Sequence, residues 1–172
     1  MNKYKTSSNL VLIGMPGCGK TTIGIILSEK LKIDFIDMDE YIEKKTKSTI
    51  TDLFIKGEEY FRAIESEIVQ EISTLKSSII STGGGIVKNH NNIMKLKENG
   101  IIIFIDRPID LIVSNIKTST RPLLTDGAHK LYELYNDRYQ LYKASSDFIV
   151  NNDKKIQRVI VDIIKIYKRE KD

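Results

Sequence analysis

The stretch Leu10-Val11-Leu12-Ile13-Gly14-Met15-Pro16-Gly17-Cys18-Gly19-Lys20-Thr21-Thr22 decides the fold of this chain. Its first four residues are apolar and mostly branched, which is typical of a short strand buried on both faces of a parallel sheet. The glycines then allow a tight turn, and apolar residues recur after it at helical spacing, at Ile23, Ile26, Leu27 and Leu31. The stretch therefore predicts a strand, a glycine-rich turn and a helix in direct succession.

The turn matches the P-loop pattern G-x-x-x-x-G-K-S/T. Main-chain N–H groups in such a turn form a concave nest, and the helix N-terminus adds partial positive charge, so the turn attracts phosphate oxygens. We expect Lys20 to reach the β and γ phosphates of a nucleotide and the Thr21 hydroxyl to bind Mg²⁺. A turn that binds nothing is the alternative, but the flanking strand and helix are the context that the mechanism requires. The residues expected to hold ATP here are Gly14, Gly17, Cys18, Gly19, Lys20, Thr21 and Thr22.

Length and composition limit the kind of protein. The chain has 172 residues, 41% of them hydrophobic and 29% charged, which suits a single globular domain over residues 1–172. No apolar run approaches the ~20 residues of a membrane span, and the polar start leads directly into the first strand. We therefore expect a cytoplasmic protein with no secretion signal and no membrane partner. We also expect a monomer, which no pattern in the sequence specifies.

The formal net charge of +4 and the pI near 9.0 raise the question of nucleic acid binding. Lysines and acids alternate along most of the chain, so we expect no nucleic acid partner and assign the excess charge to anionic small molecules. Cys18 is the only cysteine, which excludes an internal disulfide. We interpret it as a small filler of the turn, the alternative being a thiol activated by the helix N-terminus.

Apolar strand-like runs alternate with helical patterns along the whole chain. This order predicts an α/β fold, a three-layer α/β/α arrangement around a five-stranded parallel sheet, with ligands at the carboxyl ends of the strands. The expected strands are residues 10–13, 34–37, 78–82, 100–105 and 147–150. The expected helices are residues 22–32, 39–46, 49–56, 58–75, 89–98, 108–117, 128–145 and 153–169.

Two carboxylates end the second expected strand, in Phe35-Ile36-Asp37-Met38-Asp39. Side chains two apart on an extended chain share a face, so Asp37 and Asp39 would both point toward the phosphate site. They can then divide the work between Mg²⁺ and a substrate hydroxyl. Alternatively, Asp39 only caps a helix that begins at Glu40. Taken alone, this segment leaves both interpretations open.

Arg62 and Glu65 are neighbours on one face of the expected helix 58–75. The glutamate can hold the guanidinium in a fixed pose. Such a pair is usually a surface ion pair worth well under ~1 kcal/mol, and unaided this is the interpretation that we favour.

Three glycines, Gly83, Gly84 and Gly85, end the third strand. They indicate that a ligand or another segment approaches the backbone closely, and the position at the carboxyl edge favours a ligand. Because no Asp or Glu ends this strand, we expect metal binding to rest on Thr21, Asp37 and bridging water.

Residues 117–127 combine small polar residues with a proline, a glycine and one arginine, which is typical of a mobile lid. Arg121, brought over the γ phosphate, would neutralise charge during phosphoryl transfer. An ordinary surface loop is the alternative. Arg138, in the tyrosine-rich helix that follows, says little by itself. A small acceptor with a carboxylate and a hydroxyl would use all of these groups together.

The ordered set of motifs resembles the shikimate kinases, a family of nucleoside-monophosphate-kinase-like P-loop enzymes. The resemblance runs from about residue 9 to residue 166 and rests on these pieces: residues 14–22, Asp37-Met38-Asp39, Gly57 through Arg62 to Glu65, Gly83-Gly84-Gly85, Arg121-Pro122-Leu123-Leu124, and Arg138 with Tyr142. It implies transfer of the γ phosphate of ATP to the 3-hydroxyl of shikimate.

The resemblance also implies a role for each matching residue. Thr21 and, through water, Asp37 position Mg²⁺, and Asp39 bonds the shikimate hydroxyls. Catalysis then falls to Lys20, Asp39 and Arg121, with Arg121 also contacting ATP. The acceptor is held by Asp39, Arg62, Gly83, Gly84, Gly85 and Arg138, within a substrate-binding segment of about 34–62 and its neighbours.

Three departures from the family pattern affect mainly the adenine contacts. Ser114 stands where the family often has an arginine, Gln140 replaces the proline of Pro-Leu-Tyr, and the adenine loop near residues 151–154 is not typical. The alternatives are a gluconate or other small-acid kinase, a nucleoside monophosphate kinase, and a nucleotide-binding module without turnover. The acid pair with Arg62 argues against the first, the single lid arginine against the second, and the complete set of catalytic residues against the third.

Overall fold

Five parallel strands form the centre of the computed structural model, which describes residues 8–116 and 127–171. Within these residues the strands pair in the order β2-β3-β1-β4-β5. Their bounds are β1 Asn9–Ile13, β2 Asp34–Asp37, β3 Ser78–Ser81, β4 Gly100–Asp106 and β5 Phe148–Asn151. Because all pairings are parallel, every strand ends at the same edge of the sheet.

Helices connect the strands as crossover elements. Their bounds are α1 Lys20–Leu31, α2 Met38–Thr46, α3 Ile50–Ile55, α4 Glu58–Ile72, the 3₁₀ helix η1 Ile86–Lys88, α5 His90–Glu98, α6 Ile109–Ile116, α7 Gly127–Ser145 and α8 Ile156–Lys171. Several begin at side-chain caps that the sequence supplies. Thr49 and Asp52 form a reciprocal capping box at α3, and the Asn89 side chain accepts from the Asn91 N–H at the start of α5.

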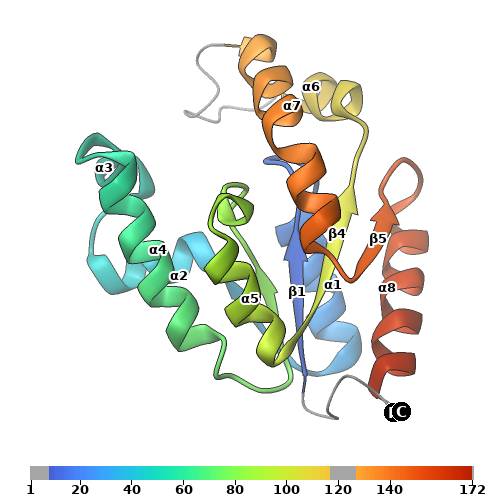
Figure 1. The fold of residues 1–172 in the computed structure, drawn as a ribbon. Helices are drawn as coiled ribbons and strands as arrows, with labels where there is room; N and C mark the ends of the chain where they lie inside the picture. The colour runs from blue at the N-terminus through green and yellow to red at the C-terminus, as the bar shows by residue number, and fades with distance from the viewer. Residues whose placement is uncertain (1–7, 117–126, 172) are drawn as a thin grey trace.

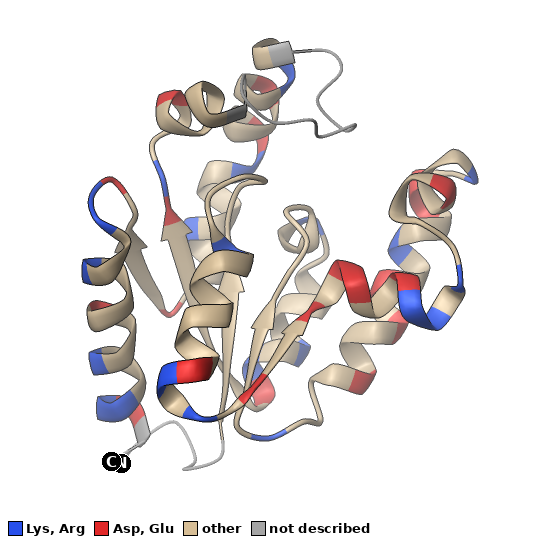
Figure 2. Cartoon of the chain, turned by 180° about the vertical axis from the view of Figure 1, so that it is seen from behind, with Lys and Arg blue, Asp and Glu red and all other residues tan. Residues whose placement is uncertain are grey.

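The elements make three layers (Figure 1). Helices α1 and α8 pack against each other on one face of the sheet, and α5 and part of α7 cover the other. Helices α2, α3 and α4 project beyond β2, at the opposite edge from β5. The strands carry almost no charged residues along their length, whereas Lys, Arg, Asp and Glu gather on the helices (Figure 2).

The centre of the sheet is fully apolar. Residues Leu10–Ile13 of β1 and Ile101–Ile103 of β4 have no exposed surface, and β1 lies between β3 and β4. Burying each such aliphatic side chain contributes about 1.5–3 kcal/mol, so the middle strands fix the turn that follows β1 firmly in place.

The predicted fold class is confirmed, and every predicted helix and strand is present. The largest errors are at helix ends: α4 stops at Ile72, not at residue 75, and α8 starts at Ile156, not at residue 153. The short helix η1 was not predicted. The predicted lid, about 117–127, lies almost entirely outside the described residues.

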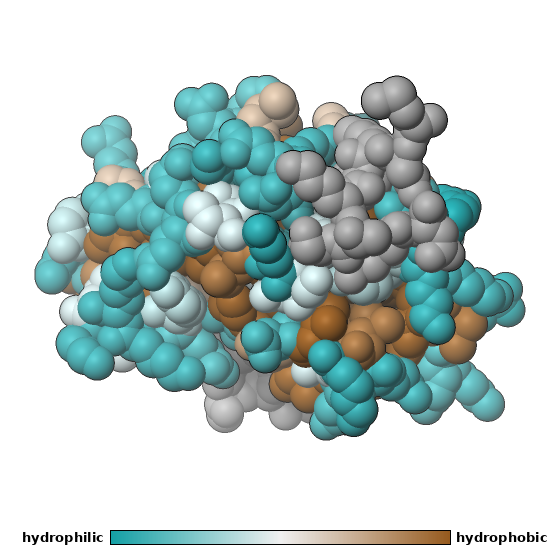
Figure 3. Space-filling model, turned by 90° about the horizontal axis from the view of Figure 1, so that it is seen from below, coloured by the Kyte–Doolittle hydropathy of each residue, from teal (hydrophilic) through white to brown (hydrophobic). Residues whose placement is uncertain are grey.

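The surface at the amino ends of the strands is largely hydrophilic, with smaller apolar patches between the polar side chains (Figure 3). Over the part of the chain that the structure describes, no helix combines the length and the hydrophobicity needed to span a bilayer.

Candidate active site

The turn between β1 and α1 has the backbone of a phosphate nest. Gly14, Gly17 and Gly19 have φ values of +146°, +80° and +103°. At Gly14 a Cβ would also lie 2.8 Å from the Ile105 carbonyl oxygen, so both space and conformation require glycine there. Among the described residues no side chain caps the N-terminus of α1, which leaves its first N–H groups to face an anion.

Lys20 folds over this turn. Its Nζ donates to the carbonyl oxygens of Gly14 and Met15 at 2.8 and 3.0 Å, and only 8% of the residue is exposed. The ammonium group is therefore held at the first residues of the turn. Cys18, within the nest, is fully buried, which fits the interpretation as a filler of the turn.

Thr21 and Asp37 are joined by a hydrogen bond beside the nest. The Thr21 hydroxyl donates to Asp37 Oδ2 at 2.7 Å, which joins the first turn of α1 to the end of β2. Hydroxyl and carboxylate oxygens are the ligands that Mg²⁺ prefers, and Mg²⁺ usually keeps several waters besides. The two residues therefore fit the expected role in metal binding. No group of three or more acidic, His or Cys side chains that could hold a metal occurs in the described residues.

The expected geometry of Asp37 and Asp39 is wrong in one respect. Asp39 lies in the first turn of α2, because the helix begins at Met38 and not at Glu40. The residue that caps α2 is Asp37, whose Oδ1 accepts from the Asp39 and Glu40 N–H groups. The strand alternation therefore ends at Asp37, and Asp39 reaches the site from a helix. Its interpretation as a mere helix cap is also wrong.

Asp39 has an unusual electrostatic environment. Desolvation by the surrounding protein, followed by the charge of Asp37, raises the pKa of the Asp39 carboxyl above its ordinary value of 3.8, although Lys20 and Arg62 act in the opposite direction. A carboxyl with a raised pKa, close to a lysine and an arginine, is typical of functional sites.

Arg62 and Glu65 are not a surface pair, contrary to the interpretation favoured from the sequence. Glu65 is 1% exposed, and its Oε2 accepts from Arg62 Nη1 at 2.7 Å. Burial raises the pKa of Glu65, while Arg62 opposes the rise and Asp39 adds to it. The pair faces Gly83, where a Cβ would lie 3.1 Å from Asp39 Oδ1 and 3.6 Å from Glu65 Oε1. Asp39, Arg62 and Glu65 therefore form one cluster.

The three glycines after β3 form a wall that lies against both this cluster and the phosphate nest. A Cβ on Gly85 would overlap the Arg62 guanidinium, and one on Gly84 would lie 2.8 Å from Cδ of Pro16 in the nest. The Gly84 carbonyl oxygen accepts from Arg138 Nη1 at 3.2 Å and from the hydroxyl of buried Tyr142 at 2.5 Å. The glycines therefore link α4, α7 and the turn after β1.

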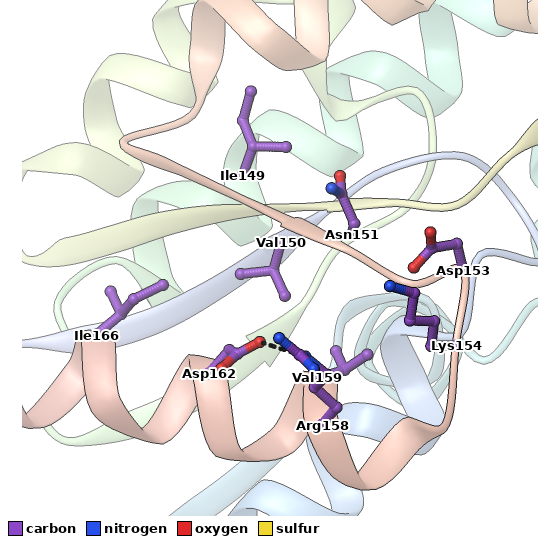
Figure 4. A pocket seen from close by; sticks show the side chains of 9 residues that line it. All are labelled: Ile149, Val150, Asn151, Asp153, Lys154, Arg158, Val159, Asp162 and Ile166. Atoms are coloured by element: carbon purple, nitrogen blue, oxygen red, sulfur yellow. Dashed lines mark ion pairs between the residues drawn. The ribbon is translucent and has the colours of Figure 1, made fainter.

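The end of β5 and the residues that follow it form a buried part and an exposed part. Asn152 is buried, and its Nδ2 donates to the Cys18 carbonyl oxygen at 2.8 Å. Asn151, Asp153 and Lys154 instead line a hollow of about 380 Å³ at the sheet edge, which α8 completes with the Arg158–Asp162 ion pair (Figure 4). Of the predicted adenine loop, Asn152 is the residue that contacts the nest.

The predicted site residues thus fall into one region, with one exception. The nest contains Gly14, Gly17, Cys18, Gly19, Lys20, Thr21 and Thr22, and the cluster beside it contains Asp37, Asp39, Arg62, Gly83, Gly84, Gly85 and Arg138. Arg121 lies outside the described residues. The sequence reasoning missed the bonds of Asn152, of the Tyr142 hydroxyl and of Glu58, which contacts Arg62, because residues far apart in the chain make most of them.

Comparisons with known proteins identify the family. A model of the shikimate kinase family matches residues 16–168. The shikimate kinase of Clostridium botulinum (strain Alaska E43 / Type E3) is 51% identical over 159 residues, which are 92% of this chain and 96% of that protein. The shikimate kinase of Clostridium beijerinckii is 49% identical over 156 residues, 91% of this chain and 92% of that protein.

Solved structures give the same result. Shikimate kinase from Acinetobacter baumannii, solved in complex with shikimate, has a TM-score of 0.88 and 31% identity, covering 97% of this chain and 96% of that one. Shikimate kinase from Bacteroides thetaiotaomicron has a TM-score of 0.86 and 26% identity, covering 94% and 98%. A gluconokinase from Sinorhizobium meliloti, at 15% identity and a TM-score of 0.60, shares the fold alone. The family model and these relatives show that this chain, with its phosphate nest and the neighbouring cluster, belongs to the shikimate kinase family.

Proposed function

We propose that this chain transfers the γ phosphate of ATP to the 3-hydroxyl of shikimate, giving shikimate 3-phosphate and ADP. The observation that carries the proposal is the close approach of Gly84 to Pro16, where a Cβ on Gly84 would lie 2.8 Å from Pro16, because it brings the wall of the Asp39–Arg62–Glu65 cluster against the phosphate nest. A hydroxy acid in that cluster would lie next to the triphosphate, as in-line transfer requires.

The phosphate side of the site is proposed to work through positioned charge. The N–H groups of the nest and the start of α1 would hold the phosphates, and Lys20 would exchange its bonds to Gly14 and Met15 for phosphate oxygens. Thr21 and, through water, Asp37 would hold Mg²⁺, which supplies neutralisation of phosphate charge when bound. Arg121 would add a further positive charge from the segment 117–127.

The acceptor side is proposed to divide binding from proton handling. Arg62, held by Glu65, and Arg138, held by the Gly84 carbonyl, would bind the acceptor carboxylate. Asp39 would accept a hydrogen bond from the attacking hydroxyl. Its raised pKa makes the carboxylate a stronger base than an ordinary aspartate, so it is suited to take the proton late in the transfer.

The finer predictions on the cell and on assembly belong to the same proposal. We expect a monomeric cytoplasmic enzyme that needs Mg²⁺ and has neither a nucleic acid nor a membrane partner. The alternation of charges along the chain supports the absence of a nucleic acid partner. Light scattering at micromolar concentration measures the mass directly, and a dimer would contradict the monomer prediction.

The decisive experiment is an assay of ADP release with MgATP and three acceptors offered separately. Shikimate should support turnover, whereas gluconate and AMP should leave ADP release at its background rate. Identification of shikimate 3-phosphate by mass spectrometry completes the test. Turnover with gluconate or AMP in place of shikimate would reject the proposal, as would ATP binding without turnover for any of the three.

A further inference from the structure

The guanidinium of Arg62 is bonded by two different carboxylates. Glu65 takes Nη1 at 2.7 Å. A single oxygen of Glu58, Oε1, accepts from both Nε and Nη2 at 3.3 Å. A carboxylate that binds arginine well uses two oxygens in two parallel bonds, so Glu58 holds the Nε–Nη2 edge weakly.

The two glutamates differ in how firmly they are held. Glu65 is 1% exposed, so it has no room to leave Arg62, whereas the Glu58 side chain is 48% exposed. The same Oε1 of Glu58 also accepts from Lys88 Nζ at 2.5 Å. Lys88, and then Arg62, lower the pKa of Glu58, so it is an anion at neutral pH. Glu65 is therefore a fixed partner of Arg62 and Glu58 an exchangeable one.

Glu58 also has a place to go. A hollow of about 510 Å³ lies beside both the Glu58 and the Arg62 side chains, and it is lined by Glu58, Glu59, Arg62, Lys88, Asn89, His90 and Asn91. By rotating toward Lys88, Glu58 can leave Arg62 and still keep an ion pair. Such a move does not strand a charge without a partner.

We propose that Glu58 competes with the acceptor carboxylate for the Nε–Nη2 edge of Arg62 and thereby weakens the binding of carboxylate acceptors. The inference rests on the proposed function, since it takes Arg62 to bind that carboxylate. An acceptor carboxylate that forms two parallel bonds with this edge of Arg62 displaces the single oxygen of Glu58, which keeps its bond to Lys88. A ligand that offers only one acceptor oxygen gains no advantage over Glu58, so the competition also favours carboxylates over hydroxyls at this position.

The test compares Glu58→Gln with the wild type in KM, kcat and calorimetric Kd for shikimate. An ion pair with a half-exposed partner stabilises by under about 1 kcal/mol. Removing the competing pair should therefore make the variant bind shikimate about two- to fivefold more tightly. Lys88→Gln should have the opposite effect, about twofold or more, because Glu58 then has only Arg62 as a partner. With the methyl ester of shikimate, which cannot form the two charged bonds, Glu58→Gln should bring at least as large a gain in affinity, because the competitor that excludes single-oxygen ligands is gone.

The matched control is Glu59→Gln, which removes the same charge from the same hollow one residue further along α4. It should leave the Kd for shikimate unchanged. Equal gains in both variants would show a general charge effect, and weaker binding in Glu58→Gln would show that Glu58 only holds Arg62 in place; either result overturns the inference.

If the wild type phosphorylates no shikimate, the proposed function fails first. Turnover by the wild type with unchanged affinity in Glu58→Gln contradicts the inference alone.

Discussion

The hydroxyl of Thr21 donates a 2.7 Å hydrogen bond to Oδ2 of Asp37, while Oδ1 of the same carboxylate caps α2. One aspartate therefore ties the phosphate nest to the helix that carries Asp39. Residues 16 positions apart are joined, so the halves of the site proposed to bind the metal and the acceptor share a common anchor.

Asp37→Asn tests the metal half of the site. Asparagine caps helices about as well as aspartate, so α2 should keep its start, but the charge proposed to attract Mg²⁺ through water is lost. We expect the Mg²⁺ concentration for half-maximal activity to rise about 10- to 100-fold, by analogy with other residues around metal ligands. Asp34→Asn, at the opposite end of β2, is the control and should not change it. An unchanged Mg²⁺ requirement in Asp37→Asn would reject its role.

Asp39→Asn should reduce activity and increase stability at the same time. The pKa of Asp39 is raised in the folded protein, so the native state binds this proton more tightly than the unfolded chain. The ionised carboxylate therefore lowers stability progressively as the pH rises from 3.8 through the raised pKa. Asp39→Asn should melt above the wild type at neutral pH, and the difference should disappear in acid.

The loss of activity in Asp39→Asn should be about 10²-fold in kcat if the carboxylate accepts the proton. Stopped assays of kcat against pH and thermal melts over the same pH range measure both effects. Glu40→Gln is the control, because Glu40 faces Lys44 on the surface of the same helix. A variant that melts below the wild type at neutral pH would contradict the assigned electrostatics.

Gly85→Ala should weaken acceptor binding through Arg62. Gly85 has φ −95°, which alanine adopts readily, so the new Cβ acts only by displacing the guanidinium that it would overlap. We expect the KM for shikimate to rise about tenfold, at the low end of what a lost charge-assisted bond costs, with the KM for ATP unchanged. In an Arg62→Ala background the same change should have no further effect. A full additional loss in that background would show that Gly85 acts by another route.

Arg138→Ala should weaken shikimate binding about 10- to 150-fold, since a charge-assisted pair is worth about 1.5–3 kcal/mol. The Tyr142 hydroxyl still donates to the Gly84 carbonyl, so the glycine wall should persist. Calorimetry with each ligand separates the effects, and ATP binding should barely change. Lys130→Ala removes one positive charge from the exposed start of the same helix as a control. Equal losses for both ligands would contradict the assignment.

Arg121→Ala should lower kcat by ~10³-fold or more, by analogy with arginines that neutralise charge on a transferring phosphoryl group. The KM values should change much less, because the interaction strengthens in the transition state. Lys117→Ala, in the same segment, is the control. A loss of under tenfold with unchanged KM would reject the role.

The fold could be predicted from the sequence because short-range sequence patterns determine most of its helices and strands. The apolar run of β1, the glycines of the turn and the helical spacing after Lys20 each act over a few residues, so they predict the observed elements with small errors at their ends. The boundary error at the start of α2 comes from capping by Asp37. Nothing in the strand pattern itself shows that Asp37 closes β2 and also starts α2.

The sequence by itself determined the phosphate nest, because glycine conformations and the order strand, turn, helix are local properties. Only the tertiary structure decided whether Arg62 and Glu65 form an exposed surface pair or a buried one. Spacing makes them neighbours on a helix, but their burial, the raised pKa of Glu65 and the bond from Glu58 depend on the glycine wall and on Lys88. Desolvation is set by all the segments that pack around a group, and for this reason it cannot be read from any one of them.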